Sequence, residues 1–286
     1  HECSSAASDV YKRQPKEYGQ WFIKSIKHFN FENIDSPELS LFGGMGGNNI
    51  KSSIFGMQFG NLAGLLGKFS WGLSQFGLIL PQSSTLGINQ KNFNTKITSF
   101  EADESDLTLG LFAIEYTTLC LGVYTEPFKN IMNTLTKSSE EMIENLKDLN
   151  LDMNPETINN PQEMFTNISG VEGIDPSKVF ENIAAPLSFY RSVIKQKSKD
   201  LDILQDESIF DLLMDLSFSN YESPTKDIET KISELDNYSD NFLNYLVDSK
   251  STFSIEEILS DSDLIPTIDE LYDPINWATR TSMPPI

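Results

Sequence analysis

The sequence is poor in the residue types on which most enzyme chemistry depends. Its 286 residues include only two cysteines and two histidines, and the arginines are Arg13, Arg191 and Arg280. Acid–base catalysis, phosphate binding and zinc coordination rely mainly on histidine, cysteine and arginine. We therefore expect a protein that is not an enzyme and that has no cofactor and no metal site.

The first 14 residues, "HECSSAASDVYKRQ", resemble adaptor sequence that is translated at the ends of metagenomic contigs. A segment of that kind carries no information about the fold, so we set it aside and predict that residues 1–14 pack against nothing. The remaining cysteine is then Cys120, which excludes an internal disulfide, and the remaining histidine is His28.

Charge divides the rest of the chain into two parts. Residues 138–286 contain 30 acidic and 10 basic residues, whereas residues 1–137 contain 12 and 11, so that nearly all of the net charge of −21 lies in the second part. We expect a glycine- and aromatic-rich domain at 15–137 and an acidic region at 138–286. The acidic field favours solubility, cations or a basic protein partner, and it disfavours nucleic acid.

The spacing of apolar residues predicts an α+β protein. Alternation over "TKITSF" and "LTLGLFAIEY" predicts two strands, hence a small antiparallel β-sheet or sandwich core in the N-terminal half. Helical spacing recurs within residues 18–29, 126–135, 175–190 and 226–248, so we expect the acidic C-terminal region to be mostly helical.

Local signals refine this reading of the C-terminal region. Ser254 and Glu257 are spaced as a capping box at the start of a helix. Pro186 lies inside one helical pattern and should kink that helix. The tail "DPINWATRTSMPPI" is rich in proline and aromatic residues, and we expect it to dock as an extended arm.

The stretch "IFGMQFGNLAGLLGKFSWGLSQFGLIL" (54–80) is the most unusual part of the sequence because glycines recur in it at four-residue spacing. On a helix such glycines share a face and permit close packing of a neighbouring element. We predict a buried segment that meets its own sheet or a neighbouring subunit, with these packing and self-association residues: Gly56, Gly60, Gly64 and Gly67.

The same stretch allows a second interpretation, a membrane-associated protein. It is long enough to span a bilayer, which needs about 20 mainly apolar residues. Lys68 lies near its middle, however, where a charge costs about 2.5–3.5 kcal/mol on insertion. Its six glycines also weaken a helix in water, by about 1 kcal/mol each against alanine.

Residues 70–135 resemble the tail-tube and baseplate-tube proteins of tailed phages. The resemblance is carried by an apolar run ending in "LILP", the segment "FNTKITSF", an acidic turn, the segment "LTLGLFAIEYT" and the short helical pattern "PFKNIM". It implies a β-sandwich with one helix that stacks into rings through its sheets, and hence a virion structural protein. The acidic region after residue 138 has no place in that pattern.

Two groups of acidic residues could carry chemistry. A calcium-loop alternation is present, but Met153 and Asn159 stand where that loop needs glycine and glutamate; its acidic and amide positions are Asp148, Asn150, Asp152 and Asn154. Paired carboxylates, which a glycosidase would need, occur at Glu101, Asp103, Glu104, Asp261, Asp263 and Asp269.

The sequence thus predicts a non-enzymatic structural or assembly protein, and the resemblance implies a component of a phage tail or baseplate. We expect it to form homo-oligomers or to bind a basic partner or other structural proteins. Its location would be the virion under the phage interpretation. The alternatives are a membrane-associated protein that uses residues 54–80 and a carboxylate-dependent hydrolase.

Overall fold

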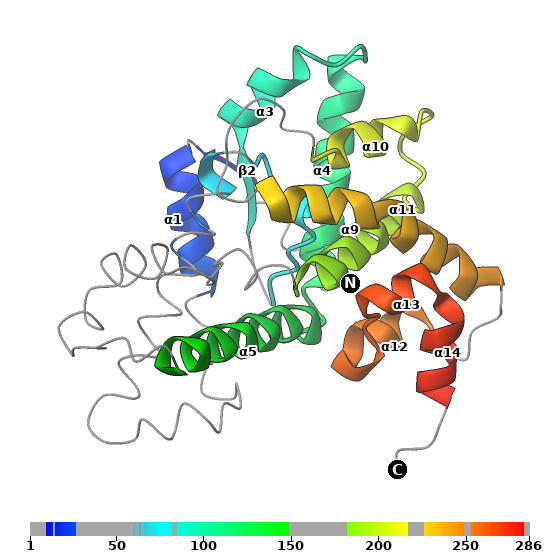
Figure 1. Cartoon of the computed structure of the whole chain (residues 1–286). Helices are drawn as coiled ribbons and strands as arrows, with labels where there is room; N and C mark the ends of the chain where they lie inside the picture. Colours follow the sequence, from blue (N-terminus) through cyan, green and yellow to red (C-terminus); the bar gives the residue numbers. More distant parts are fainter. Residues whose placement is uncertain are drawn as a thin grey trace.

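The computed structural model of the chain describes residues 10–13, 15–26, 60, 63, 66–68, 70–81, 85–148, 182–216, 226–248 and 253–282. Most of these residues are helical (Figure 1). The elements are β1 (Val10–Arg13), α1 (Pro15–Ile26), the 3₁₀ helix η4 (Ser74–Phe76), β2 (Leu86–Asn89), α3 (Gln90–Ile97), α4 (Glu104–Leu121), α5 (Glu126–Asp148), α9 (Ala184–Lys199), α10 (Ser208–Met214), α11 (Lys226–Asp248), α12 (Ile255–Ser260), the 3₁₀ helix η5 (Ser262–Leu264), α13 (Ile268–Tyr272) and α14 (Pro274–Ser282).

Helix α9 lies at the centre of the helical array, between α11 and α5 in Figure 1. Every residue from Ala184 to Ile194 is buried, because α4, α5, α10, α11 and η4 all pack against this helix. Phe189 of α9 and Phe242 of α11 meet edge to face, with ring centroids 5.8 Å apart. A helix that is covered on all sides needs an apolar surface all round, which these residues mostly supply.

The predicted antiparallel sheet is wrong. "TKITSF" contributes the end of α3 and the turn that follows it, and "LTLGLFAIEY" lies inside the 18-residue helix α4. The Asp103 carboxylate begins α4 by accepting hydrogen bonds from the backbone N–H groups of Ser105 (2.8 Å) and Asp106 (3.3 Å). Aspartate at this position satisfies N–H groups that have no partner within the helix.

The error has a physical cause in the burial of α4. This helix is covered on most of its surface, including Gly110, Leu111, Ala113, Ile114 and Glu115 in one stretch. Burial on several sides removes the contrast between an apolar and a polar face, so the run fitted a strand pattern as well as a helical one.

The described strands form one short parallel pair. Val10 to Arg13 of β1 lie opposite Leu86 to Asn89 of β2. The expectation that the first 14 residues pack against nothing is therefore wrong for the β1 residues.

Most of the other helix predictions are confirmed where the structure describes them. Tyr18, Trp21, Phe22 and Ile26 form the buried side of α1. The capping box of Ser254 and Glu257 is present at the start of α12. In α5 and α11 the predicted apolar stripes are buried, at Phe128, Ile131, Met132, Leu135, Ile232, Leu235, Phe242 and Leu246.

Two expectations for the C-terminal region need correction. Pro186 lies in the first turn of α9, where its missing N–H group is not needed, so it marks the beginning of a helix and not a kink. In the expected extended arm, residues 283–286 lie outside the described residues, while residues 274–282 instead form helix α14, which is anchored by Trp277. This side chain is 2% exposed, and its indole N–H donates to the Leu264 carbonyl at 2.7 Å.

Candidate functional site

The buried carboxyl group of Glu115 is the most unusual ionisable group in the described residues. Glu115 lies on α4, with 3% of its surface exposed. Its Oε2 accepts a hydrogen bond from the Leu73 backbone N–H at 3.1 Å, and its Oε1 accepts from the Ser74 N–H at 3.1 Å and from the Ser74 hydroxyl. The partners lie 41 and 42 residues earlier in the chain, where Leu73 precedes η4 and Ser74 is its first residue.

The segment around Gly72 is shaped to reach this carboxyl group. A Cβ atom at Gly72 would lie 1.8 Å from Glu115 Oε1, so the carboxyl group can keep this position only beside a glycine. Ser70 hydrogen-bonds the backbone of Gly72 with its hydroxyl group, and the Gln75 side chain accepts from the Trp71 N–H at 3.0 Å. These side-chain hydrogen bonds pair backbone groups of Trp71 and Gly72, which lie outside the helices and strands.

Burial raises the pKa of the Glu115 carboxyl to about 7, although the hydrogen bonds from Ser74 and Leu73 act in the opposite direction. A carboxyl with such a pKa can exchange protons near neutral pH. Burial, followed by the charge on Glu115, also raises the pKa of the Tyr18 phenol well above its usual value.

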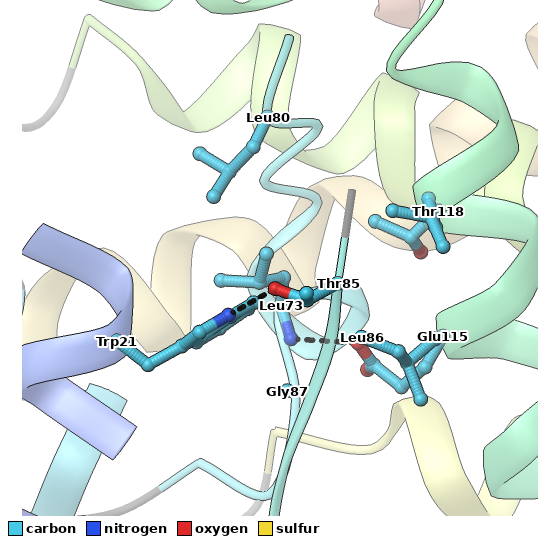
Figure 2. Close-up of a pocket in the computed structure, with 9 residues that line it drawn as sticks. Trp21, Leu73, Leu80, Thr85, Leu86, Gly87, Glu115 and Thr118 are labelled. Carbon is cyan, nitrogen blue, oxygen red and sulfur yellow. Dashed lines mark hydrogen bonds between the residues drawn. The ribbon is translucent and has the colours of Figure 1, made fainter. Parts of the chain in front are cut away.

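The cavity beside Glu115 has a volume of about 10 Å³, roughly the space for one water molecule. Figure 2 shows it between Trp21, Thr85 and Glu115. Trp21 donates its indole N–H to the Thr85 hydroxyl oxygen at 2.9 Å across one side. The cavity volume is too small for an organic substrate in this conformation.

Glu115 was not among the sequence candidates. The available signal was its position as the single acidic residue in the apolar run from Leu107 to Leu121. A lone acid in a buried run needs specific partners. The sequence does not indicate which residues donate hydrogen bonds to Glu115, because Leu73 and Ser74 lie in a distant segment.

The predicted packing glycines fall partly outside the described residues. Gly56 and Gly64 lie outside them. Gly60 is exposed, and a Cβ atom there would meet no atom within 4 Å, so no close packing against Gly60 is present among the described residues. Gly67 is buried, and its carbonyl oxygen accepts hydrogen bonds from the amides of Asn89 (2.8 Å) and Asn92 (3.4 Å).

The predicted carboxylate candidates serve helix ends or lie in solvent. Asp103 begins α4, and Asp261 accepts from the Asp263 N–H at the start of η5. Asp269 is exposed in the first turn of α13. The structure does not bring three or more metal-ligating side chains together among the described residues. The calcium-loop candidates at 150–159 and His28 lie outside those residues.

A second candidate site is an open groove on the N-terminal part, which we call the lysine groove. It has a volume of about 970 Å³ and lies between α1, the residues Ala63, Gly67 and Lys68, and α3. Small and apolar residues line it together with four lysines; the lining residues are Lys16, Gly19, Gln20, Ile23, Lys24, Ala63, Gly67, Lys68, Lys91 and Asn92. Within the described part of the chain, Lys16, Lys24 and Lys91 form no ion pair.

The basic residues of α9 are used differently. Lys195 pairs with Asp240 at 2.6 Å and with Asp211 at 3.1 Å, and Lys197 pairs with Glu256 at 2.7 Å. Burial alone would lower the pKa of Lys195, but the two aspartates raise it overall. These lysines hold the helices together, whereas the lysine groove presents positive charge at the surface.

A third feature is an exposed patch in the C-terminal part of the chain, which we call the tyrosine face. The rings of Tyr238 (α11) and Tyr272 (α13) meet edge to face, with centroids 4.6 Å apart, although they are 42% and 46% exposed. Ile275, at the start of α14, is 64% exposed. The exposed carboxylates Asp269 and Asp273 flank Tyr272 in the sequence.

Comparisons of the chain with family models, with curated proteins and with solved structures found no match. No single helix among the described residues has the length and apolar composition to cross a membrane. The pair formed by α4 and the first half of α5 meets those criteria jointly, with an 82° bend between its parts.

Proposed function

We propose that this protein is a non-enzymatic structural protein that assembles with other protein chains. The observation that carries the proposal is the separation of charge over the fold. A groove lined by four lysines lies on a near-neutral N-terminal part, and exposed acids with aromatic side chains lie on the strongly acidic C-terminal part. Complementary charged surfaces of this kind guide association between proteins and define its orientation.

A component of a phage tail or baseplate, located in the virion, is the specific form of this proposal. It rests on the sequence resemblance of residues 70–135. The β-sandwich that the resemblance implies is not present in the described residues, where α3, α4 and the start of α5 occupy the matched region. Assembly would therefore use helical surfaces and grooves in place of stacked sheets.

The hydrolase alternative receives no support from the geometry around Glu115. This carboxyl has a pKa suited to acid–base chemistry, but it faces a cavity of one water molecule. The exposed carboxylates at the starts of α4 and η5 accept backbone hydrogen bonds.

Sedimentation velocity of the full chain tests the assembly proposal. We expect association at about 0.1 M salt and dissociation at about 1 M, because the screening length falls from roughly 10 Å to roughly 3 Å. A chain that stays monomeric at every protein concentration and ionic strength would contradict self-assembly.

A further inference from the structure

We propose that the lysine groove of one molecule binds the tyrosine face of a second copy of this chain, head to tail. This inference rests on the proposed assembly function and names its partner surface. The basic partner expected for the acidic region is then the groove of a neighbouring molecule.

The groove has the chemistry to bind an acidic, aromatic protein surface. Its lysines come from α1, from the 66–68 segment and from α3, so positive charge surrounds a centre formed by Gly19, Ile23 and Ala63. Ile23 is 39% exposed there. Lysine interacts with carboxylates by charge and with tyrosine rings through cation–π contacts.

The groove is also large and open enough for several side chains. Its volume of about 970 Å³ is at the upper end of pockets that bind small molecules. Gly19 keeps α1 close to the segment that forms the opposite wall, since a Cβ atom there would lie 3.1 Å from the Ala63 carbonyl oxygen.

The tyrosine face provides the complementary groups. Two tyrosine rings and Ile275 are exposed where burial would be favourable, and tyrosine is enriched in the energetic centres of protein interfaces. The edge-to-face contact holds both rings in place, so little side-chain entropy remains to be lost on binding. Asp269 and Asp273, three residues before and one residue after Tyr272, add exposed negative charge, and Asp273 also accepts a hydrogen bond from the Ile275 N–H at 3.2 Å.

One molecule cannot join its own two surfaces in this fold. Figure 1 shows α1 and α3 at the left and top of the molecule and α13 and α14 at the lower right, with α9 and α11 between them. When the groove of one molecule binds the face of another, the resulting dimer still has one free groove and one free tyrosine face. Repetition therefore produces a ring or an open filament.

Local charge complementarity favours a second copy as the occupant of the groove. The net charge of −21 repels nucleic acid, an anionic membrane and another copy alike at long range, but only another copy presents exposed carboxylates beside tyrosine rings to the lysines of the groove. Each molecule carries one groove and one acidic tyrosine face, so the two surfaces are always present in equal amounts.

The first test is charge reversal in the groove, followed by sedimentation of the full-length protein at about 0.1 M salt. Lys24→Glu and Lys91→Glu change exposed residues of the groove. Lys137→Glu on α5 is the matched control, because it is also exposed, lies outside the groove and changes the net charge equally. We expect the two groove variants to weaken association by about tenfold or more and the control to assemble like the wild type. Unchanged helical circular dichroism would show that the variants fold.

The second test mixes two defective variants. Tyr272→Lys should be monomeric because a lysine on the tyrosine face meets the lysines of the groove. The Lys24→Glu variant, which has an intact face, should be monomeric as well. A mixture contains one intact groove and one intact face for each pair of molecules, so we expect a 1:1 dimer that does not grow further.

Each remaining outcome has a definite meaning. If the wild type assembles and the two groove variants Lys24→Glu and Lys91→Glu associate as strongly as the control Lys137→Glu, the groove inference is overturned. The proposed assembly function would still stand. A mixture that stays monomeric overturns the head-to-tail contact. A wild-type chain that is always monomeric contradicts both proposals, and binding of single-stranded polynucleotide through Lys24 and Lys91 would identify nucleic acid as the occupant.

Discussion

At the scale of single residues, Glu115 links three parts of the fold. Its carboxyl group joins α4 to the segment before η4 and borders a cavity that Trp21 of α1 also lines. Burial favours the neutral form of a carboxyl group, while the three donated hydrogen bonds favour the charged form. Burial has the larger effect here, because the pKa is raised from 4.5 to about 7.

This pKa predicts a dependence of stability on pH. The folded protein holds the Glu115 proton more tightly than the unfolded chain does, so the stabilisation is fully present below about pH 4.5 and is lost as the pH rises to about 7. The loss amounts to about 3 kcal/mol in the free energy of unfolding. Urea unfolding between pH 4 and pH 8 measures it.

Glu115→Gln is the control, because glutamine does not titrate. The difference in unfolding free energy between the wild type and this variant should change by about 3 kcal/mol across that interval. A difference that is constant with pH would show that Glu115 is ionised throughout.

Gly72 permits the close approach of its segment to Glu115. Gly72→Ala would place a methyl group 1.8 Å from Oε1, so the Glu115 carboxyl group must leave its hydrogen bonds or one of the two segments must move. We expect a loss of about 1–3 kcal/mol in the free energy of unfolding by urea.

Gly60→Ala is the matched control, since a Cβ atom meets no neighbour at that helical position. It should be neutral or stabilising by up to about 1 kcal/mol. Equal destabilisation by the two variants would contradict the tight contact at Gly72.

At the scale of elements, a polar seam joins α9 to α11 inside an otherwise apolar interface. Arg191 is 3% exposed, and it donates from Nε and Nη2 to the two carboxylate oxygens of Asp236 at 3.0 and 2.8 Å. One turn away, Ser192 and Lys195 both donate to Asp240 at 2.6 Å. These directional bonds define how the two helices align along their length.

Breaking the Arg191–Asp236 pair should be costly. Asp236→Asn leaves the buried guanidinium without its counter-charge, and we expect a loss of about 3 kcal/mol, the low end for a broken buried pair because Asp236 is partly exposed. Thermal and urea unfolding would both report it. Glu256→Gln breaks the more exposed pair with Lys197 and should cost at most about 1 kcal/mol. Similar losses in both variants would contradict a special role for the seam.

At the scale of the whole molecule, the fold keeps its two kinds of surface apart. The lysine groove and the tyrosine face lie at the two ends of a helical array, and α9 connects those ends through its contacts with η4, α4 and α11. Strand β1 lies at the N-terminal end of this array and pairs with β2.

Deletion of residues 1–13 should change the melting temperature by less than about 2–4 °C. A pair of four-residue strands adds under 1 kcal/mol or so, because isolated two-stranded units are marginal in water. Differential scanning calorimetry measures the change. A larger drop would show that β1 belongs to the native fold and would exclude an adaptor origin for the segment.

The sequence alone determined the features that depend on neighbouring residues. The buried stripes of α1, α5 and α11 have a polar face opposite them, so the 3.6-residue period was visible. The capping box at Ser254 needs only Glu257 three residues later. The charge difference between the two parts of the chain is a matter of composition.

Only the tertiary structure decided the features that depend on distant segments. Helix α4 is covered on several sides, so its sequence shows no clear 3.6-residue spacing of apolar residues and also fitted the pattern of a strand. Glu115 receives its hydrogen bonds from residues more than 40 positions away, and Arg191 and Asp236 are 45 positions apart. The lysine groove likewise combines residues of α1 and α3 with Ala63, Gly67 and Lys68. Such partners are brought together by packing of the whole chain, because no local pattern specifies which segments will meet.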